Sequence, residues 1–228
     1  ELGTVWARLG AEVEVIEFLP RILPGMDDEI AKKFMAMAKR QGLSFRLKTA
    51  VKAANTSKSG VTLTVEPAGG GDTETIKADI ALVAVGRHPA TESLGLDDVG
   101  VALSDRGRIR VDSRFETSVE DIYAIGDVID GPMLAHKASK EGEVAAEVIA
   151  GHPAQFDLKA IPAVVFTDPE IASVGMTRKE AQDAGHKVAT GKFSFAANGR
   201  AMSLGDTEGF IRVVIDKEAE VLLGIEAV

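Results

Sequence analysis

The 228-residue sequence predicts an α/β fold in its first part and a smaller α+β unit in its last part. Near the start, a helical pattern is followed directly by a short strand pattern. Residues 80–85 form one continuous apolar run, which is typical of a buried parallel strand. From residue 158 onward, several short strand patterns surround one helical pattern, which favours an antiparallel sheet with a helix.

The first helix is predicted by apolar residues that recur at spacings of three and four. One face of this helix would carry Leu2, Val5, Trp6 and Leu9. Gly10 can end the helix in the left-handed conformation, and a strand at 12–17 then ends in Glu17. No capping residue precedes the helix, and a strand at 221–228 stops without a turn. We therefore expect an internal piece of a longer chain.

A second helix is predicted to begin at 27–29, where three acidic side chains suit a helix N-terminus, and to end at Gly42. Its inward residues should be Ile30, Phe34, Met37 and Ala38. Strand patterns at 44–47, 50–56 and 61–66 follow, with hairpin signals between them. The glycine-rich segment 69–72 is predicted to be an exposed turn, because no helix follows it as a phosphate loop would require.

After residue 80, predicted strands and helices continue to alternate. The apolar run ends in Gly86, a strand at 122–125 leads into Gly126 and Asp127, and a long helix is predicted from 134 to 150. Residues 154–160 have the composition of a linker. The α+β part would contain strands at 164–166, 171–174, 187–195, 208–215 and 221–227 and a helix at 177–184.

Composition excludes several classes of protein. The net charge of −9 gives no basic stripe for nucleic acid, and no apolar run approaches the roughly 18 residues of a membrane helix. The absence of cysteine excludes a disulfide scaffold and a thiol nucleophile within these residues. The four histidines are scattered, so no metal site is expected. No secretory signal is visible, and we expect a cytoplasmic location.

Three segments have patterns that suit nucleotide binding. Glu17 ends the strand that follows the first helix, where an acid can bond ribose hydroxyls; the glycine turn of such a unit would precede Glu1. Gly86 ends an apolar strand and would let a ligand approach the backbone. Asp127 ends another strand before a helix whose first N–H groups can stabilise negative charge.

Each pattern also has an ordinary structural interpretation. Glu17 could simply face solvent, and Gly86 and Asp127 could be turn residues. His136 could be a packing histidine at a helix end, and the acids at 27–29 could serve only as helix caps. Taken singly, none of the patterns decides between these interpretations.

Taken together, the motifs resemble those of the pyridine nucleotide–disulfide oxidoreductases. Residues 84–87 with Pro89 are similar to that family's Gly-Arg-x-Pro segment, and 123–127 to its second flavin-binding motif. The sequence Met-Leu-Ala-His-Lys-Ala at 133–138 resembles the members that act on lipoamide. Four further segments resemble the family's dimer-forming interface domain: 161–162, 165–172, 174–175 and 197–201. The resemblance covers essentially the whole chain in order.

The resemblance implies two cofactors, FAD and NAD. Asp127 would bond the ribityl or phosphate region of the flavin, and its isoalloxazine edge would be lined by Met133, Leu134, Ala135 and His136. Glu17, Val51 and Gly86 would contact NAD. Phe18 and Leu19 follow Glu17, and the next cation is Arg21, beyond Pro20, whereas NADP-dependent members place arginines directly after this strand.

Catalytic residues are not expected within this sequence. The family's redox-active cysteine pair would lie upstream, and its His–Glu acid–base pair downstream of Val228. Glu1 matches the acid that ends the family's NAD glycine motif, which lies near the flavin and pairs with a lysine. His136 and His186 are not assigned to catalysis.

The implied function is oxidation of protein-bound dihydrolipoamide, with electrons passing through a disulfide and FAD to NAD. Expected partners are lipoyl groups of 2-oxo acid dehydrogenase complexes or of the glycine cleavage system, and a second copy in a homodimer. The expected domains are a Rossmann-like NAD-binding domain (1–85), a returning segment of the FAD-binding domain (86–157) and an interface domain (158–228). The alternatives are another disulfide reductase of the same family, or a non-catalytic dimerisation or binding module.

Overall fold

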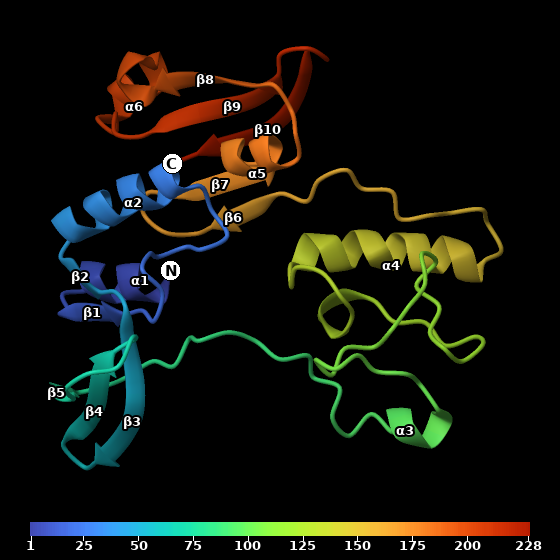
Figure 1. The fold of residues 1–228 in the computed structure, drawn as a ribbon, viewed down its shortest axis with the longest axis horizontal. Helices are drawn as coiled ribbons and strands as arrows, with labels where there is room; N and C mark the ends of the chain where they lie inside the picture. Colours follow the sequence, from blue (N-terminus) through green and yellow to red (C-terminus); the bar gives the residue numbers. More distant parts are fainter. The chain divides into compact units, whose positions relative to one another are not determined.

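The computed structural model describes residues 1–228, which form two compact units. Unit 1 combines residues 1–82 with residues 162–228, and unit 2 contains residues 83–161. Each unit has its own hydrophobic core. Two segments that are distant in sequence thus fold together in unit 1 (Figure 1).

Unit 1 begins with a small parallel sheet and two helices. The elements are α1 (Leu2–Arg8), β1 (Val13–Ile16), α2 (Asp28–Arg40) and β2 (Leu43–Arg46). β1 pairs in parallel with β2, with Val13 opposite Leu43. Asp27 caps α2 by accepting the Glu29 N–H at 2.8 Å. All four predicted inward residues of α2 are buried, so this prediction is confirmed.

A three-stranded antiparallel sheet follows. It contains β3 (Thr49–Ser57), β4 (Gly60–Pro67) and β5 (Glu74–Ala78), in the order β3-β4-β5. The register shifts between Val51 and Ala53, where one residue of β3 has no partner opposite it. The glycine-rich segment 69–72 connects β4 to β5 as an exposed turn, as predicted.

The last part of unit 1 is a five-stranded antiparallel sheet in the order β6-β7-β10-β9-β8. Its strands are β6 (Ala163–Val165), β7 (Ile171–Gly175), β8 (Val188–Ser194), β9 (Phe210–Asp216) and β10 (Val221–Ala227). The predicted helix is α5 (Arg178–Asp183), and a capping box between Thr177 and Glu180 caps its N-terminus. The sequence patterns did not predict η2 (Phe195–Ala197) and α6 (Gly199–Leu204).

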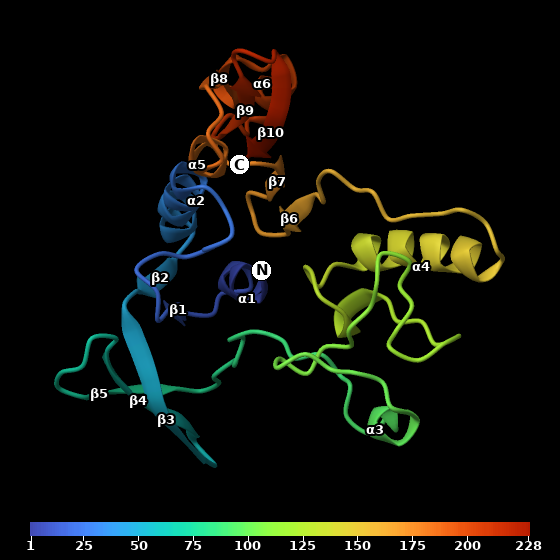
Figure 2. The same cartoon turned by 45° about the vertical axis from the view of Figure 1, so that its right-hand side comes forward.

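One core joins both parts of unit 1. Ile30, Phe34 and Met37 of α2 belong to the same buried cluster as Ile171, Phe210 and Val228. Figures 1 and 2 both show α2 beside α5 and β7. The amphipathic face of α2 is therefore buried by residues more than a hundred positions away.

Unit 2 is built mainly from loops around one long helix. Its elements are α3 (Leu96–Val99), η1 (Gly126–Val128) and α4 (Ala135–Ile149), which confirms the predicted long helix. Val144 and Val148 of α4 pack in a core with Ile109, Phe115 and Ile129. None of the helices has the length and apolar content of a bilayer-spanning segment.

The predicted strand at 80–85 is wrong. These residues form no strand, and Ile80 and Val85 are 83% and 94% exposed. No strand of the structure pairs with this segment. A parallel strand is stable only when neighbours bond its backbone and cover its faces, and here the apolar run has neither. The predicted strand at 122–125 is likewise reduced to an isolated bridge between Tyr123 and Glu116.

The first predicted helix is confirmed as α1, but its apolar face is not buried in the structure. Thr4 is the buried residue of α1, whereas Val5 is 51% and Leu9 79% exposed. The helix approaches the β1–β2 sheet at Gly3, where an added Cβ would lie 3.4 Å from Val13 Cγ1. The small residues thus face the sheet, and the apolar stripe faces away from it.

Candidate cofactor-binding sites

The Gly126–Asp127 turn is the centre of the candidate flavin site in unit 2. Gly126 has φ +77°, and an added Cβ would lie 3.2 Å from the Cβ of Ala138 on α4. Only a glycine satisfies both the conformation and the close approach. Asp127 follows in η1 with its side chain exposed, so its carboxylate is accessible to a ligand.

The N-terminus of α4 lies in the same unit, eight residues after Asp127. Leu134 occupies the cap position in an extended conformation and supplies no side-chain acceptor, and the first turn contains no acidic residue. Ala138 is the first residue whose N–H bonds back to Leu134 O, at 3.1 Å. The first-turn N–H groups before it have no acceptor within the helix, which suits negative charge on a ligand.

The four predicted flavin-edge residues lie at this helix start. Met133 and Leu134 are half-buried, whereas Ala135 and His136 are exposed. The structure therefore brings these residues and Asp127 into one compact unit. Their contact with a flavin stays a prediction.

The buried pair Lys137–Glu141 was missed by the sequence analysis. The Lys137 Nζ and Glu141 Oε1 atoms lie 2.8 Å apart, and both side chains are almost fully buried. Opposite charges four residues apart are a visible signal, but on a helix such pairs usually lie in solvent. Burial at this position could be found only from the fold.

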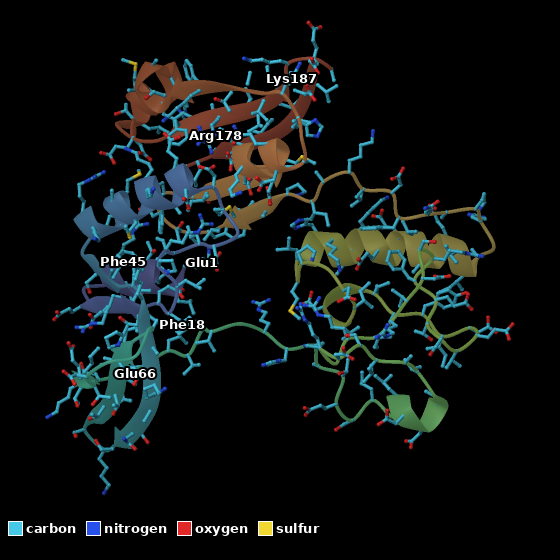
Figure 3. The ribbon with its side chains drawn as sticks, viewed as in Figure 1. Glu1, Phe18, Phe45, Glu66, Arg178 and Lys187 are labelled. Atoms are coloured by element: carbon cyan, nitrogen blue, oxygen red, sulfur yellow. The ribbon has the colours of Figure 1, made fainter.

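Glu17 lies at the end of β1, as predicted. Its N–H donates to Arg46 O at 2.9 Å, and its carbonyl accepts the Thr49 N–H at 3.0 Å. These bonds connect the end of β1 to the start of β3, where Val51 is 49% exposed. Figure 3 shows Phe18, the next residue, beside this junction. Two of the predicted NAD contacts thus lie at the same edge of unit 1.

The Glu17 carboxylate and Arg21, the next cation in the sequence, are both held locally. Glu17 Oε1 accepts the Leu19 N–H at 2.8 Å, which fixes the side chain at the strand end. Arg21 pairs with Asp28 and donates to the carbonyls of Pro24 and Met26. The Arg21 guanidinium is therefore committed to its own loop.

Gly86 and Glu1 complete the predicted set. Gly86 has φ +139° and open space where a Cβ would be, and it belongs to unit 2, whereas Glu17 and Val51 belong to unit 1. A joint contact of all three with NAD stays a prediction. Glu1, labelled in Figure 3, accepts the Phe166 N–H at 2.8 Å and so connects the start of α1 to the end of β6.

Two surface hollows lie away from the predicted site residues. One lies in unit 1 between α2 and β8 and includes Lys32, Lys192 and Phe210. The other lies in unit 2 and includes Asp130 and the Lys137–Glu141 pair. Neither is lined by any of the nine predicted site residues.

A second buried charge network, also missed, connects α2 to the five-stranded sheet. Arg212 of β9 lies 2.6 Å from Asp27, 2.9 Å from Glu29 and 2.5 Å from Glu226. Burial alone would raise the pKa of Asp27, but bonds from Arg212 and the Glu29 N–H outweigh it and lower that pKa. Burial raises the pKa of Glu226 despite Arg212, and Glu226 Oε1 has no hydrogen-bond partner.

The comparison with known families matches both parts of the chain. Residues 1–142 match the family described as pyridine nucleotide-disulphide oxidoreductase, and residues 161–228 match its dimerisation domain. The chain belongs to this family. The sequence resemblance and the predicted fold class, α/β followed by an α+β interface domain, are thereby confirmed.

Similar proteins share the sequence over nearly its whole length. The mitochondrial dihydrolipoyl dehydrogenase of Pisum sativum is 47% identical over 99% of this chain, and the dihydrolipoyl dehydrogenase of Geobacillus stearothermophilus is 47% identical over 100%. A leghemoglobin reductase of Glycine max is 46% identical over 99%. These matches cover 45%, 48% and 43% of the relatives, so the chain spans about half their length.

Solved structures agree with this assignment. An HOCl-induced flavoprotein disulfide reductase of Escherichia coli is 27% identical with a TM-score of 0.90, and the match covers 99% of this chain and 51% of that one. LpdA of Mycobacterium tuberculosis is 26% identical with the same TM-score, over 100% of this chain and 49% of its own.

Proposed function

We propose that these residues form part of a longer flavoenzyme that oxidises protein-bound dihydrolipoamide and reduces NAD⁺. The supporting observation is the motif at 123–138, which places an accessible aspartate and the N-terminus of α4 in one unit of a chain 47% identical to dihydrolipoyl dehydrogenases. The overall reaction converts a dithiol and NAD⁺ to a disulfide, NADH and a proton. Its thiol chemistry requires cysteines from elsewhere in the polypeptide, because these residues contain none.

The residues of unit 2 fit FAD. The uncapped N-terminus of α4 and the absence of acid in its first turn suit the electronegative edge of a flavin ring, and Asp127 is free to accept a ligand hydroxyl. When bound, FAD supplies the electron transfer between disulfide and nicotinamide. Asp127 would bind its ribityl or phosphate region, and residues 133–136 would orient the ring edge.

The residues at the end of β1 fit NAD. A carboxylate fixed at a strand end can accept both hydroxyls of an unphosphorylated ribose. Glu17 has one oxygen bonded to the Leu19 N–H, which orients its other oxygen for a ligand. Val51 and Gly86 would add contacts, and Glu1 would lie near the flavin. NAD is therefore the proposed electron acceptor.

The proposed organisation follows the family. Residues 1–85 would be NAD-binding, 86–157 the returning part of the FAD-binding domain, and 158–228 the interface through which two copies associate. Lipoyl groups of 2-oxo acid dehydrogenase complexes or of the glycine cleavage system would be the partners. A cytoplasmic location stays a prediction, because similar relatives include proteins named as mitochondrial.

The activity can be tested by steady-state assay. The complete polypeptide should bind FAD and form NADH from dihydrolipoamide and NAD⁺, whereas the 228 residues alone should form none because they lack cysteine. A flavin-loaded complete protein without dihydrolipoamide oxidation would contradict the proposal. So would turnover by the 228 residues alone.

A second candidate function is reduction of another substrate by the same chemistry. It is favoured by the leghemoglobin reductase at 46% identity. Activity of the complete protein with other disulfides or with haem proteins, without lipoamide activity, would identify this alternative. A complete protein that dimerises but takes up no flavin would instead be a non-catalytic module.

A further inference from the structure

The Lys137–Glu141 pair is buried at a place where charge is costly. The two side chains are 3% and 2% exposed. Lys137 also lies in the first turn of α4, where the helix dipole disfavours a cation. A buried ion pair rarely stabilises a fold more than well-packed apolar side chains of the same size would. Stability alone is therefore a weak reason for this pair.

The pair contacts both backbone polar groups of one residue. Glu141 Oε2 accepts the Gly126 N–H at 2.8 Å, and Lys137 Nζ lies 3.3 Å from the Gly126 carbonyl oxygen. These interactions are buried, so water does not replace them. Gly126 in turn directly precedes Asp127 and is held in the left-handed conformation.

The packing around the pair leaves little freedom. An added Cβ at Gly131 would lie 2.7 Å from Lys137 Cε, and one at Gly142 would lie 3.3 Å from Ile125 Cδ1. Ile125 and Gly126 therefore both lie against α4, the first at Gly142 and the second at Glu141. Loss of the bond to Gly126 would allow the turn to move relative to the helix N-terminus.

We propose that Glu141, held in place by Lys137, is a positioning residue for the flavin site. It fixes the Gly126–Asp127 turn against α4, so that the Asp127 carboxylate and the first-turn N–H groups can contact the same flavin at once. This inference rests on the proposed function, because it concerns FAD. It adds a residue that touches no cofactor but determines the geometry of two groups that would.

Two double variants of the complete polypeptide separate the hydrogen bond from the charge. Lys137→Met/Glu141→Gln removes both charges but keeps a side-chain acceptor for the Gly126 N–H. Lys137→Met/Glu141→Leu has nearly the same volume and removes that acceptor as well. The matched control is Lys140→Met/Glu143→Leu, which removes a 2.8 Å pair exposed on the same helix.

The measurement is the FAD dissociation constant of the apoprotein, determined by titration at a temperature where each variant is folded by circular dichroism. The Leu variant should bind FAD about tenfold or more weakly than the Gln variant, because the neutral bond to the Gly126 N–H is lost and that buried donor is left without an acceptor. The control should remain within about twofold of wild type, as expected for a surface pair. Amide exchange at Gly126 should accelerate only in the Leu variant.

Equal FAD affinity of the Gln and Leu variants would overturn the inference. If the Leu variant does not fold, Lys137→Met/Glu141→Ala replaces it with the same expectation. The proposed function fails separately, if the wild-type complete polypeptide takes up no FAD. Wild-type FAD binding with equal affinity of the two variants would remove only the positioning role.

Discussion

At the residue scale, the candidate sites depend on carboxylates whose surroundings differ. Asp127 is exposed beside a helix start, Glu17 is fixed at a strand end by the Leu19 N–H, and Glu141 is buried against Lys137. The first two can accept bonds from a ligand, whereas the third can only hold the protein itself. The same chemical group would thus bind a ligand at two positions and hold the protein backbone at the third.

Replacement of Asp127 by alanine should weaken FAD binding by the complete protein. A charge-assisted bond contributes about 1.5–3 kcal/mol, which corresponds to about a tenfold or larger rise in the dissociation constant. Titration of the apoprotein with FAD measures this change. Asp130→Ala, at a nearby acid whose side chain is 79% exposed, is the control and should have little effect. Stoichiometric FAD retention by Asp127→Ala after dilution would contradict the assignment.

Replacement of Glu17 by alanine should reduce the preference for NAD over NADP. Glu17 can bond an unphosphorylated ribose and would repel a 2′-phosphate, and Arg21 is held by its own loop. Discrimination of about 10²-fold or more is expected in the wild type and should fall sharply, mainly through weaker NAD use. The ratio of kcat/KM for the two cofactors is the measurement. Glu14→Ala on the same strand should leave the ratio unchanged; an unchanged ratio in Glu17→Ala would refute this role.

At the scale of elements, α2 connects the two sequence segments of unit 1. Its apolar face shares a core with the five-stranded sheet, and Asp27 and Glu29 at its N-terminus pair with Arg212. The acids at 27–29 were expected as caps, and Asp27 is one. Their ion pairs with a strand nearly two hundred residues later give the same residues a second role.

Replacement of Asp27 by asparagine should destabilise the protein near neutral pH. Asparagine keeps the helix cap but loses the charged bond to Arg212, which should cost about 1–2 kcal/mol. Because the folded pKa of Asp27 is lowered, its contribution is present above the ordinary value of 3.8 and is lost as the pH falls through the folded pKa. The difference between wild type and variant should therefore disappear in acid.

Urea unfolding at pH 7 and at a series of pH values that descends well below 3.8 measures this difference. Glu226 has a raised pKa, chiefly because it is buried, so its ionisation costs stability at neutral pH and this cost is relieved on acidification. The negative charge of Asp27 contributes to this rise, so the Asp27→Asn variant should carry a smaller part of the cost. Asp28→Asn is the control, since Asp28 pairs with Arg21 at the surface. A difference that persists unchanged at acid pH would show that the Asp27 charge is not its source.

At the scale of the whole molecule, the chain leaves apolar surface uncovered. On the five-stranded part of unit 1, Phe193 of β8 and Met202 and Leu204 of α6 are 46%, 61% and 62% exposed. Residues 161–228 match a dimerisation domain, so the expected partner for this surface is a second copy of the chain. Association of two copies would remove such surface from water.

The complete protein is therefore expected to be a homodimer at micromolar concentration. Sedimentation equilibrium measures this directly, and the mass should not change with salt if apolar contacts dominate the interface. A monomeric mass for the complete polypeptide at micromolar concentration would contradict the prediction.

Local sequence patterns predicted most of the elements correctly. The spacing in α2, the acidic cap at its start and the glycine-rich turn at 69–72 are local signals, and the structure contains all three as expected. They succeed because capping, turn formation and amphipathic spacing depend on residues within a few positions of each other. The motifs at 84–89 and 123–138 also predicted the family, which the family matches over residues 1–142 and 161–228 confirm.

The tertiary structure alone decided which apolar and charged residues are buried. The run at 80–85 has the composition of a core strand but no neighbouring strand, and the apolar face of α1 is turned away from its sheet. Conversely, Lys137, Glu141 and Arg212 are charged residues in buried positions. Pairing and burial are determined by partners distant in the chain. Composition therefore shows what a segment could bury, and only the fold shows whether a partner covers it.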